Sequence, residues 1–156
     1  MSNSSESRRY AAMSYFEEGY NCSQAVVLAF YDLCGIDKEA LLKLASSFGG
    51  GMGRMREVCG AVSGMFIAAG CIYGFADTGA DGKKAEHYAR IQELAGKFKA
   101  KNGSYICREL LGLPMGNDSP VPTPRTPEFY KKRPCKELVG DAAEVLCEYI
   151  NSHQIK

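Results

Sequence analysis

The sequence predicts an all-α fold, a single-domain helical bundle around a buried central helix at residues 58–76. Three observations support this prediction. Residues 58–76 carry no formal charge, although 24% of the chain is charged, and a helix that is apolar on every side is buried. Elsewhere, apolar residues recur at helical spacing between residues that typically begin and end helices. No segment alternates apolar and polar residues as a half-buried strand does.

The central segment is rich in Gly and Ala rather than in Leu, Ile and Phe. Small residues add little hydrophobic stabilisation, but they allow two helix backbones to approach closely. A membrane-spanning helix is expected to hold more large apolar residues. We therefore expect residues 58–76 to lie in the core of a bundle and not in a bilayer.

Capping residues and apolar spacing predict further helices on both sides of the central segment. Asn21 and Gln24 form a capping box that begins a helix over residues 22–34. The glycines within residues 49–53 interrupt the helical pattern before the central helix. The other predicted helices are residues 6–18, a helix capped by Asp37, residues 83–101, a short helix from Ser104 to Leu111, another that begins at Thr126–Pro127, and a last one carrying Leu138 to Ile150.

The helix at residues 83–101 is predicted to be amphipathic, with an inner stripe of Tyr88, Ile91, Ala95 and Phe98. Two further segments are predicted to lack regular structure. Residues 113–127 hold five prolines and should form a loop, and residues 1–5 are expected to be disordered. We take residues 1–156 as one domain, because this length is typical of a single domain with its own core.

Composition narrows the classes of function. The chain has 19 Lys and Arg against 18 Asp and Glu, so it lacks the positive excess of nucleic-acid or anionic-membrane binding, and we expect neither partner. The N-terminal residues contain no apolar signal segment, which favours a cytoplasmic location. In that reducing compartment the seven cysteines are not expected to form a static disulfide framework. Catalytic, redox or metal-binding roles are therefore favoured for them.

A motif at the start of the central segment reads Cys59-Gly60-Ala61-Val62-Ser63-Gly64. With Cys22 before it and Cys107 and Cys135 after it, the chain resembles the C-GCAxxG-C-C family of redox-active proteins over about residues 15–146. The family label writes Gly before Cys, whereas this chain reads Cys-Gly-Ala-x-x-Gly. The resemblance implies a redox role for the four cysteines, without defining a reaction or substrate. Its supporting motif positions here are Gly60, Ala61 and Gly64.

Each of the four family cysteines lies near the N-terminus of a predicted helix. A helix N-terminus stabilises a thiolate through its partial positive charge and free N–H groups. This effect is about 0.3–1 kcal/mol, less than about one unit of thiol pKa, so a further positive charge is needed. Arg54, Arg56 and Arg133 are the candidates that lie near in sequence. The other cysteines, Cys34, Cys71 and Cys147, lie late in their helices and are predicted to pack as small apolar residues.

Three functions remain open on the sequence. In a thiol–disulfide oxidoreductase, one cysteine attacks an oxidised partner protein or small-molecule substrate, a second resolves the mixed disulfide, and no cofactor is required. We take Cys59 as the nucleophile and Cys22 as its resolver, with Cys107 and Cys135 as a second couple, so Cys22 and Cys59 should be neighbours. We expect the four cysteines to share a partly enclosed pocket with at least one pair within disulfide distance. Alternatively, the four thiolates bind zinc or an iron–sulfur cluster. The third possibility is a non-catalytic binding or carrier module. The sequence does not indicate an oligomeric state.

Overall fold

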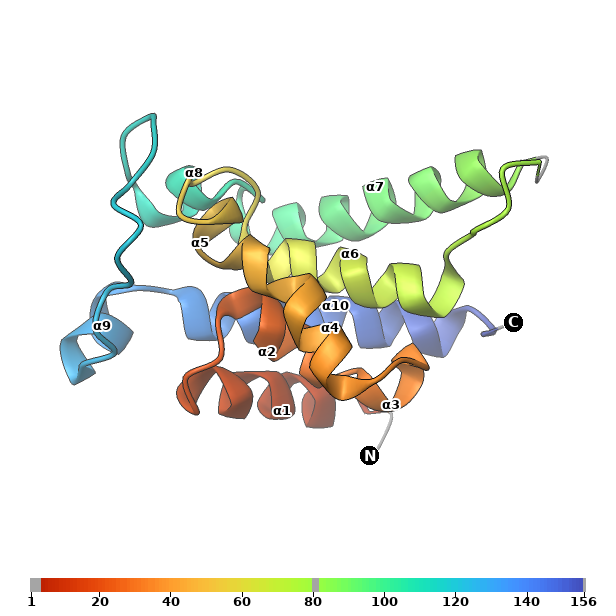
Figure 1. Cartoon of the computed structure of the whole chain (residues 1–156), viewed down its shortest axis with the longest axis horizontal. Helices are drawn as coiled ribbons and strands as arrows, with labels where there is room; N and C mark the ends of the chain where they lie inside the picture. Colours follow the sequence, from red (N-terminus) through yellow and green to blue (C-terminus); the bar gives the residue numbers. More distant parts are fainter. Residues whose placement is uncertain (1–3, 80–81, 156) are drawn as a thin grey trace.

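Figure 1 shows the computed structural model of the chain, a bundle of helices. The structure describes residues 4–79 and 82–155. Within these ranges the β-structure amounts to one isolated antiparallel bridge, between Val58 and Ile106. The predicted all-α fold is therefore confirmed.

Helix α6 (Gly60–Tyr73) runs through the middle of the bundle. It packs against α2 (Cys22–Leu28), α7 (Lys83–Asn102) and α10 (Cys135–Ser152). Most of its residues are buried, as the uncharged sequence predicts. The helix is shorter than residues 58–76, because Cys59 at its N-cap and Gly74 at its C-cap both have extended ψ values, of 132° and 172°.

Helices α2 and α6 meet backbone against backbone at Gly64. A Cβ atom at this position would lie 2.6 Å from the carbonyl oxygen of Ser23 and 3.0 Å from its Cα. Such distances are too short for a carbon contact, so only glycine fits here. The small residues of the central segment thus permit the close helix packing that the sequence predicts.

The N-terminal helix α1 (Ser5–Glu17) lies along α10 and is joined to the following helices by Arg8. This arginine is buried, with 1% of its surface exposed. Its Nη1 donates a hydrogen bond to the carbonyl oxygen of Ala29 at 2.8 Å, and its Nη2 donates to Asp32 Oδ2 at 3.0 Å. The guanidinium also lies over the Phe30 ring. Arg8 therefore connects α1 to the chain between α2 and α3 (Tyr31–Cys34).

We expect Asp32→Asn to lower the free energy of unfolding at pH 6 and to have a smaller effect at pH 3. The hydrogen bonds from Arg8 hold the pKa of the Asp32 carboxyl below its ordinary value. The stabilisation is complete above the unfolded pKa of about 3.9 and is lost as the pH falls through the lower folded pKa. Urea unfolding of both proteins at the two pH values measures the effect. An equal difference at both would show that the ion pair contributes nothing.

The segment predicted as one helix over residues 22–34 forms two helices. Its capping box is present, because Asn21 Oδ1 accepts from the Gln24 N–H and Gln24 Oε1 accepts from the Asn21 N–H. The helix ends at Leu28, since Phe30 adopts φ −122° and ψ 13°, and α3 follows. The apolar spacing continues across this break, which is why the sequence did not reveal it.

Two other local predictions are wrong. Tyr88 in α7 is 55% exposed and does not belong to the inner stripe, whose buried members are Leu94 and Phe98. Ser104 does not cap a helix, because α8 (Cys107–Leu111) has Ile106 as its N-cap residue. The Ser104 hydroxyl instead accepts from the Ile106 N–H and donates to Glu109.

The ends of the predicted loops differ slightly from the structure. Ser4 caps α1 and Ser5 begins it, which corrects the predicted disorder of these two residues; residues 1–3 lie outside the described part. The proline-rich segment runs without a helix from Gly112 to Thr126. The remaining elements are α4 (Lys38–Ala45), η1 (Ser46–Phe48), α5 (Gly49–Met52) and α9 (Pro127–Lys132).

None of the helices in the described part of the chain combines the length and the apolar character that a bilayer crossing requires.

Candidate functional site

A cavity of about 440 Å³ lies where several helices begin, and all four cysteines of the motif line it. We call it the cysteine pocket. Its wall also contains arginines, the glycines before α6, and apolar side chains that include Phe16, Phe129 and Leu138. The sequence predicted a shared pocket only from the common position of the cysteines in their helices.

Each pocket cysteine stands at the start of a helix. Cys22 is the first residue of α2, and Cys107 and Cys135 are the first residues of α8 and α10. Cys59 is the N-cap residue of α6. The predicted positions are therefore those in the structure, and the fold brings these four helix starts to one end of the bundle.

The chain segments that lead into α6 and α8 are held side by side by backbone hydrogen bonds. The Cys59 N–H donates to the Tyr105 carbonyl oxygen at 2.9 Å, and the Cys107 N–H donates to the Glu57 carbonyl oxygen at 2.6 Å. The isolated bridge lies between these two bonds. The relative placement of Cys59 and Cys107 is thus set by the backbone.

Cys22 lies against the first turn of α6. A Cβ atom on Gly60 would come within 2.4 Å of the Cys22 sulfur and 2.7 Å of the Phe48 carbonyl oxygen. Glycine at this position of the motif therefore leaves the space that the Cys22 thiol fills beside Cys59. The neighbouring glycine loop does the same for another pocket cysteine, since a Cβ on Gly51 would lie 2.6 Å from Cys107 Cβ.

The loop before α6 has an unusual backbone that places two arginines at the pocket. Gly50 and Gly51 have φ values of 68° and 70°, and the non-glycine residues Arg54 and Arg56 have φ values of 68° and 59°. A left-handed conformation costs about 1–3 kcal/mol for a residue with a side chain. Met52 in the same loop also has a positive φ, of 67°. Because the fold sustains this strain at three positions, the direction of the two arginines is a constrained feature of the site.

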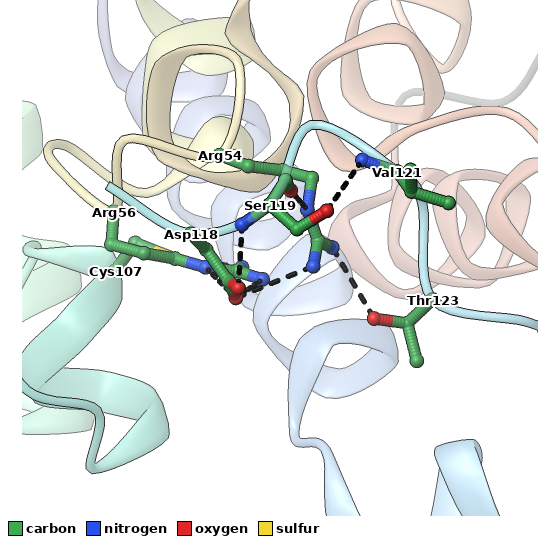
Figure 2. A network of polar contacts seen from close by, with 7 residues as sticks. All are labelled: Arg54, Arg56, Cys107, Asp118, Ser119, Val121 and Thr123. Carbon is green, nitrogen blue, oxygen red and sulfur yellow. Dashed lines mark hydrogen bonds and ion pairs between the residues drawn. The ribbon is translucent and has the colours of Figure 1, made fainter.

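Arg56 connects a pocket cysteine to an acidic residue of the proline-rich segment (Figure 2). Its side chain is 3% exposed. Nη1 donates to Cys107 Sγ at 3.6 Å, and Nη2 donates to Asp118 Oδ2 at 2.9 Å. Asp118 also pairs with Arg54 at 3.3 Å. Hydrogen bonds from Arg56 hold the pKa of the Asp118 carboxyl below its usual value, so Asp118 is ionised at neutral pH.

Burial opposes ionisation of the other three pocket thiols. It is the largest cause that raises the pKa of Cys22 and Cys59, and it raises that of Cys135 to about 12. Neighbouring pocket cysteines add to each rise, because two negative charges in one cavity repel. Backbone N–H groups at the helix starts do lower the pKa of Cys22 and Cys59, but desolvation of a buried thiolate exceeds the 0.3–1 kcal/mol or so that a helix end contributes.

The remaining cysteines lie away from the pocket wall. Cys34 and Cys147 are buried, and burial raises the pKa of both, that of Cys34 to about 12. Cys71 also raises the pKa of Cys34, so these two thiols lie near each other at the far end of α6. Burial thus raises the pKa of thiols in both groups, and what separates the two groups is access to the cavity.

Two residues of the candidate site were not identified from the sequence. Asp118 was not singled out, and neither was Arg125, whose guanidinium donates to the carbonyl oxygens of Phe16 at 2.7 Å and Tyr20 at 3.1 Å. Both lie in the proline-rich segment, and their partners are far away in the chain. The spacing of residues in the sequence does not indicate such contacts. The one sequence feature that could have identified these two residues is their charge within a segment predicted to be a loop.

The side chains of the described residues do not form a metal site. Over residues 4–79 and 82–155, no group of three or more His, Cys, Asp or Glu side chains is arranged to hold a metal ion. The four pocket cysteines share one cavity without converging on a common centre. The zinc or iron–sulfur alternative therefore stays a prediction.

Comparison with known proteins gives one match. The family model described as "Putative redox-active protein (C_GCAxxG_C_C)" covers residues 20–149. This range includes all four pocket cysteines and the glycines beside them. No curated protein and no solved structure matches the chain.

Proposed function

The chain belongs to the C_GCAxxG_C_C family, whose description is redox activity, and from this premise we propose that it is a thiol–disulfide oxidoreductase. The observation that supports the proposal is the gathering of four thiols around one cavity that also contains a buried guanidinium. Cysteines that serve only packing are expected inside the core, as Cys147 is. These four instead surround space that a substrate can enter.

Cys107 is the proposed nucleophile, in place of Cys59. Among the pocket cysteines, its sulfur accepts a hydrogen bond from a guanidinium, that of Arg56. Such a charge-assisted bond stabilises the thiolate, which is the form that attacks a disulfide. The Cys59 thiol lacks this support, and burial raises its pKa well above the ordinary value. Arg56 is therefore a positioning residue that acts through Cys107.

Cys22 is the proposed resolving cysteine. The charge of a Cys22 thiolate would raise the pKa of both Cys59 and Cys135. In the same way, the charge of a Cys107 thiolate would raise the pKa of Cys22. Cys22 is therefore near each of the other pocket thiols. Cys59 and Cys135 would then serve as a second dithiol that can reduce the first pair or hold electrons after it.

The proposed reaction balances without a cofactor. The Cys107 thiolate attacks one sulfur of a disulfide substrate, breaks the sulfur–sulfur bond and releases the first product thiolate, which takes up a proton. Cys22 then attacks the Cys107 sulfur in the mixed disulfide and releases the second product thiol. Two electrons pass from the protein to the substrate, and the two thiol protons finish on the two products.

Disulfide mapping tests this proposal. Anaerobically reduced protein is treated with one equivalent of hydroxyethyl disulfide, and its peptides are analysed by mass spectrometry without reduction. We expect the first mixed disulfide on Cys107 and the first protein disulfide between two pocket cysteines, while Cys34, Cys71 and Cys147 remain thiols. A protein in which the pocket cysteines stay reduced after prolonged exposure would contradict thiol–disulfide exchange.

A further inference from the structure

The cysteine pocket carries a large excess of positive charge. Four arginines line it: Arg54, Arg56, Arg125 and Arg133. Among the residues that the structure describes, its wall contains no Asp, Glu or Lys. A volume of about 440 Å³ falls in the range of small-molecule sites, which is about 300–1,000 Å³. The chain as a whole has a formal net charge of only +1, so this concentration of arginines is local to the pocket.

Two of these guanidinium groups have neutral partners. Arg125 donates to the main-chain oxygens of Phe16 and Tyr20 and stacks on the Phe16 ring, with its Cζ 3.8 Å from the ring centroid. Arg133 lies over Phe129, with its Cζ 5.8 Å from that centroid. Carbonyl groups and rings orient a cation without cancelling its charge. Both charges therefore remain available to a ligand.

The other two arginines share one carboxylate. Asp118 pairs with both Arg54 and Arg56. The pKa of Arg54 is lowered by burial first and then by the charge of Arg56, with Arg133 adding to the fall. The cations of the pocket therefore repel one another, and a bound anion would relieve that repulsion.

The thiols do not supply the missing negative charge. Burial raises the pKa of Cys22 and Cys59, and that of Cys135 to about 12, so these three are neutral thiols at neutral pH. The positive charge of the pocket thus exceeds what catalysis by one thiolate requires.

We infer that the substrate is an anionic low-molecular-weight disulfide that carries carboxylates on short apolar stems. The four arginines would bind the carboxylates, and the apolar wall formed by Phe16, Phe129 and Leu138 would contact the stems. The inference rests on the proposed function and specifies its substrate class. In the balanced exchange, the reduced products are two carboxylate-bearing thiols and the protein disulfide is the oxidised product.

Three disulfides of similar size and different charge test the inference: dithiodipropionate, a dianion; hydroxyethyl disulfide, which is neutral; and cystamine, a dication. Oxidation of the reduced protein is followed for each. Every rate is divided by the rate of free dithiothreitol with the same disulfide, which removes differences in intrinsic reactivity. We expect the dianion to react at least about tenfold faster than the neutral compound, and the dication to be slowest.

Arg133→Gln is the diagnostic variant. Within the described part of the chain the Arg133 guanidinium lies over the Phe129 ring and makes no hydrogen bond, so it can be removed without breaking one. The ratio of dianion rate to neutral rate should fall about tenfold. Arg133→Lys should retain most of the ratio. Lys132→Gln is the matched control, since it removes one positive charge from the adjacent exposed position, which does not line the pocket.

The outcomes separate the substrate class from the proposed reaction. Equal normalised rates for all three disulfides, unchanged in Arg133→Gln, would overturn the inference and leave thiol–disulfide exchange in place. If no disulfide oxidises the pocket, the proposed function fails, and calorimetry with octanedioate, an unreactive analogue of the dianion, decides the anion site. Binding by the wild type and Lys132→Gln, weakened in Arg133→Gln, would support an anion site, whereas no binding would overturn it.

Discussion

Replacing Cys107 with serine is expected to slow the oxidation of the protein by a disulfide by about 1,000-fold or more. Loss of the nucleophile is among the most damaging changes to a covalent mechanism. Serine has nearly the same size, and its hydroxyl can still accept the Arg56 hydrogen bond, so the fold should be retained. Stopped-flow measurement of thiol loss under anaerobic conditions gives the rate, and the thermal unfolding midpoint verifies the fold.

Cys71→Ser is the matched control for this variant. Cys71 lies in the last turns of α6 and does not line the cysteine pocket. Its replacement should leave the oxidation rate within about twofold of wild type. A wild-type rate in Cys107→Ser would assign the attack to another thiol, and Cys59, the nucleophile expected from the sequence, would be the first alternative.

Gly64→Ala is expected to lower the free energy of unfolding by about 1–2 kcal/mol. The added Cβ would stand 2.6 Å from the Ser23 carbonyl oxygen and 3.0 Å from its Cα. Because both atoms belong to the backbone, neither can rotate away, and α2 must move from α6. Overpacking of this kind costs about 1–3 kcal/mol and occasionally more, which exceeds the helix-propensity gain of roughly 1 kcal/mol. Urea denaturation monitored by circular dichroism measures the change.

Gly70→Ala provides the control in the same helix. A Cβ atom at Gly70 would meet no heavy atom within 4 Å apart from its chain neighbours and the nearby backbone of its own helix. This substitution should therefore be neutral or stabilising by up to about 1 kcal/mol, since alanine is the better helix former. Equal losses of stability in the two variants would show that the cost arises from helix geometry rather than from the contact with α2.

The local features of the fold could be predicted because each depends on residues close in sequence. The capping box of Asn21 and Gln24 is complete within three positions, and it places Cys22 at the first position of α2. The uncharged run around α6 likewise identifies a buried helix without reference to any partner. These local signals were sufficient to predict that Cys22 and Cys59 lie at helix starts.

The parts that could not be predicted depend on contacts between distant segments. The pairing of Arg56 with Cys107 and Asp118 joins three separate parts of the chain, and no residue pattern marks it. The pKa of Cys59 could not be predicted either, because its direction depends on how deeply the thiol is buried after folding. The exposure of Tyr88 could not be predicted for the same reason. Apolar spacing identifies one face of a helix, but it does not show how far along that face a neighbouring helix extends.

The wide separation of the pocket cysteines along the chain has a consequence for biosynthesis. The last of them, Cys135, begins α10, and α10 packs along α1 from the opposite end of the sequence. A nascent polypeptide therefore cannot close the pocket until the C-terminal helix has emerged from the ribosome and docked. A chain terminated before α10 carries reactive thiols but no enclosed site, so chemical competence follows the docking of α10 onto α1.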